Sequence, residues 1–376
     1  MNFVSMQLDN NQQAFLALVR AGLWEKNVQL SQFGNVDFAE IYRFAVEQSV
    51  VGLIAAGFNH VTDVKVPQDD VLQFLGSALQ LEQQNLAMNS YINVLYKKLS
   101  EAGICSVLIK GQGVGQCYER PLWRACGDID LLLDVNGYEN AKRLLFPIAE
   151  NVEKEYSYFK HVGMTLDGWV VELHGTFQSR LSKRIDNEID RIQEGVFQDN
   201  GTRVWHNGKA NVLLPCPDAD VIFIFTHILH HYFFEGIGLR QFCDWCRLLW
   251  TYRSELDLRL LESRLHKMGL MTEWKAFATF AVDYLGMTSD TMPFYSDDVQ
   301  WKKKALRICA FVLEVGNFGH KQRRHFAGMA YFVRKFVSFW GRLGDILRHF
   351  LLFPKDSVVF FGGVIRSGLY AVVRGE

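Results

Sequence analysis

Residues 126–133 read Cys-Gly-Asp-Ile-Asp-Leu-Leu-Leu, and this short stretch decides the fold. Its run of apolar residues, flanked by turn residues, predicts a β-strand over 129–133. Because side chains alternate across a strand, Asp128 and Asp130 project from one face, and the apolar residues between and after them anchor the other. Two adjacent carboxylates repel each other, and a divalent cation relieves that repulsion by taking both as oxygen ligands. The stretch therefore predicts a strand that carries a metal site.

A glycine turn precedes this strand. Residues 106–109 form a β-like run, and Lys110, Gly111 and Gly113 follow it directly, where the chain opens a helix. Free backbone N–H groups in such a turn suit phosphate oxygens, and the Lys110 side chain adds a positive charge. We therefore expect Lys110 and the Gly111–Gly113 turn to hold phosphates. The alternative for Lys110 is a solvated strand end.

A third carboxylate follows on a later strand. Residues 169–174 read Trp-Val-Val-Glu-Leu-His, which places Glu172 and His174 on one strand face. Beside Asp128 and Asp130, Glu172 would complete a two-metal site for in-line phosphoryl or nucleotidyl transfer. The alternatives are a surface carboxylate for Glu172 and a satisfied core histidine for His174.

The spacing of apolar residues divides the chain into a helical start, a short mixed sheet and a helical end. Helices are expected over 12–24, 36–57, 69–100, 138–146, 218–234, 239–252, 256–268, 271–285, 299–315 and 325–353. Strands are expected over 106–109, 129–133, 162–166 and 169–174, the last two joined by an Asp167-Gly168 hairpin turn. The expected fold class is α+β, a small mixed sheet flanked by helical regions, with domains over 1–98, 99–178 and 179–376.

The composition is that of a folded chain with an uneven charge distribution. Of its 376 residues, 49% are hydrophobic and 22% are charged, which permits a large core and excludes intrinsic disorder. The net charge of -1 hides a basic end, because residues 301–376 hold 14 Lys and Arg against 4 Asp and Glu. A basic, aromatic helix over 325–353 has three partners open to it: nucleic acid, an anionic membrane surface, or the acidic remainder of the chain.

The chain ends and the cysteines indicate a compartment. The N-terminal residues lack the charged start and apolar stretch of a signal peptide, and no apolar run reaches the ~18–20 residues that span a bilayer. We therefore expect no transmembrane segment and a cytoplasmic protein, which would meet a membrane only through residues 301–376. Seven scattered cysteines fit free thiols in a reducing compartment. Cys243 and Cys246 lack a second pair for a zinc site, so buried thiols are expected.

Taken together, these blocks resemble a known family, the uncharacterised bacterial nucleotidyltransferases of the DNA polymerase beta superfamily. The resemblance rests on Lys110-Gly111, Arg124, Gly127-Asp128-Ile129-Asp130-Leu131-Leu132, Glu172-Leu173-His174 and a later block with His227, His230, His231, Arg240 and Asp244. It covers most of residues 86–252. In the broader superfamily a Gly-Ser pair stands closer to the first aspartate, so no serine is given a phosphate-binding role here.

The resemblance implies an Mg²⁺-dependent enzyme that moves an NMP group from an NTP to an acceptor hydroxyl on a small molecule, a sugar or a protein. Asp128, Asp130 and Glu172 would hold two Mg²⁺ ions and carry catalysis, with Glu172 also open to a general-base role. The residues expected to contact the nucleotide are Lys110, Gly111, Gly113, Arg124, His174 and Arg240. For Arg124 the alternative to neutralising the leaving pyrophosphate is a structural ion pair.

Two groups of helical residues have open assignments. His227, His230 and His231 share one helix face, which predicts a polar wall facing the site or packing under it, and the spacing alone also permits zinc. Arg240 and Asp244 lie four residues apart, so an intrahelical salt bridge explains them at least as well as a substrate contact does.

Two other functions compete with this one. A tRNA- or protein-modifying enzyme of the toxin–antitoxin type has similar Lys-Gly and Asp-x-Asp elements, and the basic end would suit its RNA. A non-catalytic nucleotide- or partner-binding module would keep the fold, but a degenerate copy is expected to lose a carboxylate. The intact Asp128, Asp130 and Glu172 argue against that module.

Overall fold

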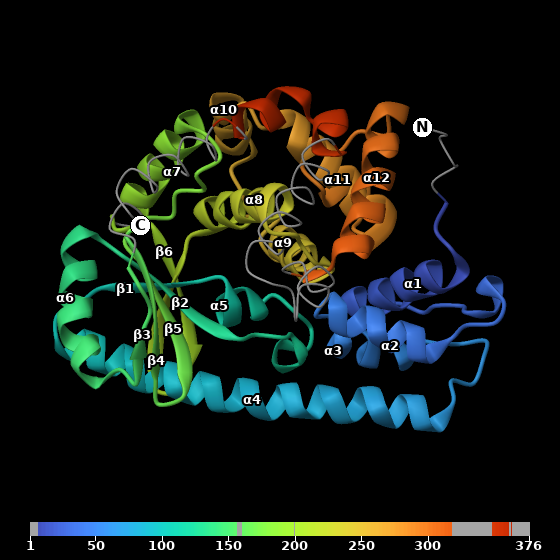
Figure 1. Ribbon diagram of the computed structural model, residues 1–376, viewed down its shortest axis with the longest axis horizontal. Helices are drawn as coiled ribbons and strands as arrows, with labels where there is room; N and C mark the ends of the chain where they lie inside the picture. The colour runs from blue at the N-terminus through green and yellow to red at the C-terminus, as the bar shows by residue number, and fades with distance from the viewer. Residues whose placement is uncertain (1–6, 156–159, 199, 318–347, 361, 363–376) are drawn as a thin grey trace, which may run out of the picture.

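The computed structural model describes residues 7–155, 160–198, 200–317, 348–360 and 362, and within them the expected α+β fold class is confirmed (Figure 1). The helices are α1 (Asn10–Trp24), α2 (Phe38–Glu47), α3 (Val51–Phe58), α4 (Gln68–Glu101), α5 (Gly111–Gly115), α6 (Val135–Leu145), α7 (Lys183–Val196), α8 (Pro217–Phe234), α9 (Leu239–Thr251), α10 (Leu258–Met268), α11 (Met271–Leu285) and α12 (Val299–Val315). Short 3₁₀ turns are η1 (Ser31–Phe33), η2 (Pro121–Trp123), η3 (Phe146–Ile148) and η5 (Ser289–Thr291). The strands are β1 (Ser106–Ile109), β2 (Asp128–Leu133), β3 (Asn151–Val152), β4 (His161–Leu166), β5 (Trp169–His174), β6 (Thr202–Asn207) and β7 (Ala210–Pro215).

Five strands form the mixed sheet, in the order β1-β2-β5-β4-β3. The β2–β5 pair is parallel and sets Asp130 opposite Glu172, whereas β1–β2 and β4–β5 are antiparallel. The β4–β5 hairpin turns at Asp167 and Gly168, with φ values of 49° and 77°. Positive φ at both central residues is the requirement of a type I′ turn, which explains the Asp-Gly sequence. The register therefore places Asp130 of β2 beside Glu172 of β5, although the two strands come from separate parts of the chain.

The two faces of the sheet have different partners. Ile129 and Leu131 of β2 belong to a core with Met88 of α4 and Tyr138 of α6. Leu132, on the same face as the aspartates, belongs to the larger core that also holds the buried residues of α1, α8, α9 and α11. One face therefore packs on α4 and α6, and the other, which carries the acidic residues, is turned toward the helical half.

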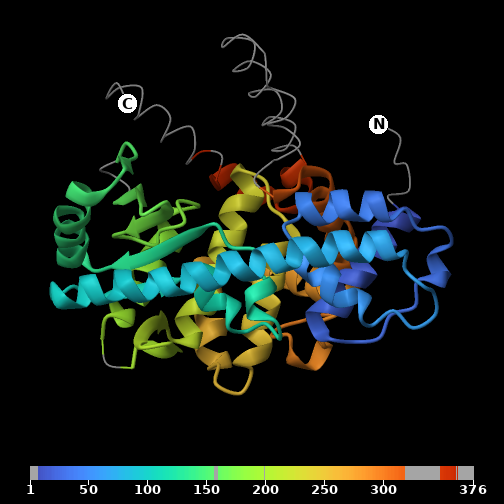
Figure 2. The same cartoon turned by 90° about the horizontal axis from the view of Figure 1, so that it is seen from below.

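Helix α4 joins the two halves. It runs the length of the molecule along both the N-terminal helices and the sheet, and it lies below them in Figure 1 and in front of them in Figure 2. Its 34 residues span about 50 Å at 1.5 Å per residue. Phe74 and Ala78 near its start lie in the larger core, and Met88 and Ile92 lie in the sheet core. The expected three-part division of the chain remains a prediction.

The single helix expected over 36–57 is wrong, because two helices, α2 and α3, occupy it. The chain breaks at Ser49, whose φ of 56° is incompatible with a continuing right-handed helix. Glycine and proline are absent from the break, so the spacing of apolar residues gives no sign that the helix ends there.

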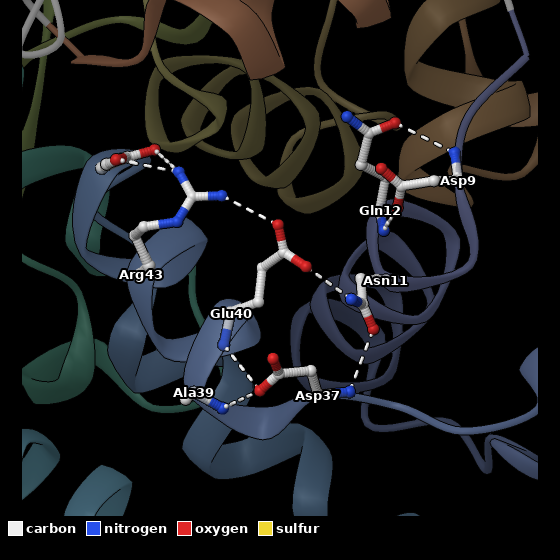
Figure 3. A network of polar contacts seen from close by, with 8 residues as sticks. Asp9, Asn11, Gln12, Asp37, Ala39, Glu40 and Arg43 are labelled. Carbon is white, nitrogen blue, oxygen red and sulfur yellow. Dashed lines mark hydrogen bonds and ion pairs between the residues drawn. The ribbon is translucent and has the colours of Figure 1, made fainter.

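A polar network fixes the start of α2 against α1 (Figure 3). The Asp37 carboxylate caps α2 by accepting hydrogen bonds from the backbone N–H groups of Ala39 and Glu40, at 3.0 and 3.2 Å. The Asp37 N–H donates to the Asn11 side chain of α1 at 3.0 Å, and Asn11 donates to the Glu40 carboxylate. Asp37 therefore caps the first N–H groups of α2, and Asn11 of α1 holds this capping residue in place.

The segment between the sheet and α8 has structure that the apolar spacing does not predict. Helix α7 is followed by the β6–β7 hairpin, a separate two-stranded sheet. Val212 and Leu214 of β7 complete the sheet core. The Tyr96 hydroxyl, 3.2 Å from the Ser106 carbonyl and 3.3 Å from the Leu213 carbonyl, connects β1 to β7. Part of the expected C-terminal domain thus closes the sheet core.

The described part of the basic end packs onto the rest of the chain. Leu352 and Phe353 are buried in the larger core, and the Lys304 ammonium of α12 lies 4.7 Å from the Phe353 ring centroid. Arg348 pairs with Glu314 at 2.9 Å. Most of the helix expected over 325–353 lies outside the described residues.

Among the described helices, none is both long and apolar enough to cross a membrane. Cys243 and Cys246 are free, buried thiols, as expected.

Replacing Gly22 with alanine should destabilise the fold. A Cβ on Gly22 would lie 1.8 Å from the Leu53 carbonyl oxygen, because α1 and α3 cross there in backbone contact. We expect the free energy of unfolding to fall by about 1–3 kcal/mol in urea titrations. Gly76→Ala on α4 is the matched control: nothing lies within 4 Å of its added Cβ, so alanine should stabilise the helix by about 0.5–1 kcal/mol. A Gly22→Ala protein as stable as the wild type would contradict the close crossing.

Candidate active site

A cavity of about 420 Å³ lies between the acidic face of the sheet and helices α8 and α9. The sheet contributes side chains from β2, β4 and β5, and residues 176–180 close one end. The predicted site residues that line it are Lys110, Gly111, Arg124, Asp128, Asp130, Glu172, His174 and Arg240. The fold therefore gathers residues from six separate stretches of sequence into one pocket.

The three carboxylates converge on the sheet wall. Oxygens of Asp128, Asp130 and Glu172 all lie within 4.8 Å of one another, because Asp130 and Glu172 are register partners on parallel strands. The negative charge of Asp130, burial and the charge of Glu172 together raise the pKa of Asp128 to about 6. Like charges held this close, on carboxylate oxygens, are the donor set that a divalent cation prefers.

Lys110 projects into this acidic group from the end of β1. Its backbone has φ of 55°, a left-handed conformation that ends the strand, and its Nζ lies 3.2 Å from Asp130 Oδ1. Burial disfavours the ammonium, but the charges of Asp130 and Glu172 outweigh burial and raise the pKa of Lys110. The side chain is therefore a buried, charged lysine, and a solvated strand end is excluded.

Two histidines contact the third carboxylate. His161 Nε2 lies 3.1 Å from Glu172 Oε2, and His174 Nε2 lies 3.5 Å from the same oxygen and 2.8 Å from Asp130 Oδ1. Burial alone would raise the pKa of Glu172, but the hydrogen bonds from His161 and His174 hold it below its usual value. Burial likewise opposes protonation of His174, yet its bonds to Asp130 and Glu172 raise its pKa.

His161 is a site residue that the sequence analysis missed. It faces the cavity because β4 pairs it directly with His174 across the hairpin. The signal was present: counting outward from the Asp167-Gly168 turn pairs Leu166 with Trp169 and so His161 with His174. The loop after β5 supplies further lining residues that no motif marks: Thr176, Phe177, Gln178, Ser179 and Arg180.

Arg124 forms a buried ion pair rather than facing the cavity with a free guanidinium. Its Nε and Nη2 donate to the two carboxylate oxygens of Asp244 at 2.9 and 2.7 Å, and its Nη1 donates to the Ala125 carbonyl. The Tyr118 hydroxyl also donates to Asp244, at 2.7 Å. Burial opposes the guanidinium charge, but Asp244 outweighs it and raises the pKa of Arg124. Arg124 thus ties the segment before β2 to α9.

This pairing corrects the interpretation of α9. Asp244 takes Arg124, and Arg240 instead donates to the Ala125 carbonyl at 3.0 Å, so the intrahelical Arg240–Asp244 salt bridge considered from the sequence is not formed. Arg240 lines the cavity. Arg240 is therefore the arginine of α9 that borders the same cavity as the carboxylates.

The two glycines of the turn have different surroundings. Gly111 has φ of 42° and lines the cavity, and a Cβ there would lie 3.3 Å from Cys126 Sγ. Gly113 does not line the cavity: a Cβ there would lie 2.8 Å from Leu214 of β7. Gly113 therefore lets the hairpin approach α5, and Gly111 is the glycine that borders the site.

Helix α8 forms the wall opposite the carboxylates. His227, His230 and His231 all line the cavity, as a polar wall predicted from their spacing. His227 Nε2 lies 3.1 Å from His231 Nε2, and burial together with the charge of Lys110 lowers the pKa of His227 well below its usual value. Burial also lowers the pKa of His231, although Glu235 opposes it. This wall is therefore polar, with His227 neutral.

Comparison with protein families assigns a class to this arrangement. Residues 34–286 match the model of a family described as uncharacterised nucleotidyltransferase. Comparisons with curated proteins and with solved structures found no match. The matched segment contains the whole sheet and every residue that lines the cavity. Because it spans more than half of the 376 residues, the chain belongs to this family and is a nucleotidyltransferase.

Proposed function

We propose that the protein uses Mg²⁺ to transfer an NMP group from an NTP to an acceptor hydroxyl inside this cavity. The observation that carries the proposal is the convergence of Asp128, Asp130 and Glu172 within 4.8 Å beside Lys110. Transfer of a nucleotidyl group needs neutralisation of phosphate charge and activation of a hydroxyl. An acidic cluster that holds metal, flanked by a buried cation, meets both needs.

The donor chemistry fits the proposed metal. All three ligands are carboxylates, the oxygen donors that Mg²⁺ selects, and the raised pKa of Asp128 reflects a repulsion that a cation would relieve. Bound there, one or two Mg²⁺ ions would supply charge neutralisation for the triphosphate and acidity for the acceptor hydroxyl. Hydrogen bonds from two histidines hold the pKa of Glu172 below its usual value, which makes it a weak base and favours a ligand role over a general-base role.

The cationic residues divide the phosphate contacts between them. Lys110 is buried beside Asp130, and we assign it to the triphosphate, which would compete with Asp130 for the ammonium. Gly111 lines the cavity at the same point, where its backbone can approach the phosphates closely. Arg124 is committed to Asp244, so we assign it to positioning α9, and Arg240 takes its proposed place near the leaving pyrophosphate.

The competing functions are separated by the acceptor. A non-catalytic module is disfavoured because all three carboxylates are present and converge. The tRNA- or protein-modifying alternative of the toxin–antitoxin type depends on a basic end free to bind. The described part of that end packs onto the body through Phe353 and Arg348, and the acceptor itself has to be identified by experiment.

Asp128→Asn and Glu172→Gln should each lower nucleotidyl transfer at least about a thousandfold, because each removes a carboxylate that would hold the Mg²⁺ ions needed to offset the charge of the reacting phosphates. The measurement is transfer of label from each of the four α-labelled NTPs, with Mg²⁺, to the chain itself, to tRNA and to a small-molecule extract. Label on tRNA, weakening steeply with salt, would select the alternative acceptor.

Asp167→Asn is the matched control for these variants. It makes the same substitution at the tip of the β4–β5 hairpin, outside the cavity, and Asn-Gly suits the same turn. Its transfer rate should equal that of the wild type. Full activity in Asp128→Asn, or absence of transfer from any NTP to any of the three acceptor pools, would contradict the proposed function.

The metal-free Asp128→Asn protein should be more stable than the metal-free wild type at pH 7, by on the order of 1–3 kcal/mol. The folded-state pKa of Asp128, about 6, lies above the value of ~3.9 in an unfolded chain, so the wild type carries a penalty above pH 6. That penalty, and hence the difference between the proteins, should vanish as the pH falls from about 6 toward 4. Urea unfolding in a chelator at several pH values measures it. A less stable variant at pH 7 would show that Asp128 is not under electrostatic strain.

A further inference from the structure

We propose that His161, His174 and Glu172 form a second metal position that takes a divalent transition-metal ion, such as Zn²⁺, rather than Mg²⁺. The inference deepens the proposed function and rests on it, since Glu172 belongs to both groups of ligands. Nitrogen donors from two histidines give this position a chemistry that the three carboxylates alone do not have.

The donor atoms are spaced as ligands of one small ion. His161 Nε2 and His174 Nε2 lie 3.1 and 3.5 Å from Glu172 Oε2, and the potential ligand atoms of all three residues lie within 4.8 Å of one another. Ligands bound tetrahedrally at 2.0–2.1 Å stand about 3.4 Å apart. The observed spacings therefore need only small side-chain adjustments to surround an ion.

The scaffold holds these donors on rigid elements. His161, the first residue of β4, and His174, the last of β5, are register partners, and their rings lie 4.6 Å apart between centroids. Glu172 stands two residues before His174 on the same face of β5. His174 is largely buried, whereas His161 is about a third exposed at the rim of the cavity, so an ion can enter from the cavity side.

The two positions would share a bridge. Glu172 also lies within 4.8 Å of Asp128 and Asp130, so its carboxylate can join an all-oxygen position to a mixed nitrogen–oxygen position. Imidazole suits Zn²⁺ and other late transition-metal ions, whereas carboxylate and water suit Mg²⁺ and Mn²⁺. The site is therefore asymmetric, with Mg²⁺ expected at the oxygen position and a transition metal at the histidine position.

The competing reading is that the histidines only orient Glu172 through hydrogen bonds. The two readings diverge for His161→Gln. The glutamine amide still donates a hydrogen bond to a carboxylate, but it is a poor ligand for a transition metal. If the histidines only orient Glu172, His161→Gln should bind Co²⁺ as the wild type does. If His161 is a metal ligand, both His161→Gln and His161→Ala should lose Co²⁺ affinity.

The test is a titration of the full-length, chelator-treated protein with Co²⁺ in excess Mg²⁺, followed by visible absorption of the bound ion. We expect the wild type to bind Co²⁺ with an absorption band that excess Mg²⁺ does not remove. The Co²⁺ dissociation constant should rise at least about tenfold in His161→Ala and in His161→Gln. Asp128→Asn should keep the band, because Asp128 belongs only to the oxygen position.

His206→Ala is the matched control, since His206 is an exposed histidine on β6 that does not line the cavity. It should bind Co²⁺ as the wild type does. Wild-type affinity in either His161 variant, or displacement of Co²⁺ by Mg²⁺, would overturn the inference. Transfer with Mg²⁺ alone, without a His161-dependent band, would remove this inference and leave the proposed function. A His161-dependent band without nucleotidyl transfer would remove the proposed function instead.

Discussion

Repulsion among three carboxylates is the constraint on which the site depends. Two unit charges 4 Å apart repel by about 4 kcal/mol at an effective dielectric constant near 20, and a whole domain is stable by only about 5–15 kcal/mol. Asp128, Asp130 and Glu172 can therefore share one wall only if groups that stabilise negative charge stand beside them. Lys110 and His174 meet Asp130, and His161 and His174 meet Glu172, whereas Asp128 keeps the raised pKa.

The positions of these partners of the carboxylates account for several local features of the fold. Lys110 reaches Asp130 because β1 ends opposite it and the chain then takes a left-handed backbone conformation. His174 reaches Asp130 because β5 runs parallel to β2. A second pair, Arg124 with Asp244, anchors α9 to the segment before β2 and so contributes to the opposite wall. Removing one partner of a buried ion pair typically lowers the free energy of unfolding by about 3–5 kcal/mol. This link is therefore costly to break, and it holds the two walls of the cavity in place.

The local patterns in the sequence predicted much of the fold and part of the site. The apolar run over 129–133, the Asp-Gly turn and the apolar spacing of α8, α9, α11 and α12 are read within a few neighbouring residues, and the structure confirms them. The break at Ser49 has no glycine or proline to mark it. The Arg124–Asp244 pair joins residues 120 positions apart, so the i, i+4 spacing pointed to Arg240 instead. His161 needed the hairpin register to be counted rather than a motif to be matched.

The contrast between the two cavity walls bears on the acceptor. The sheet wall is anionic and would become cationic toward phosphate once metal is bound, whereas the α8 wall presents His227, kept neutral by burial and by the charge of Lys110. Glu235 at the end of α8 lines the same wall, and hydrogen bonds from His230 and His231 lower its pKa and keep it anionic, so this wall suits a hydroxyl-bearing group of low charge better than a second run of phosphates. The cavity volume of about 420 Å³ is within the usual range for small ligands. Charge and volume thus agree in favouring a small or locally uncharged acceptor over a polyanion lying in the cavity.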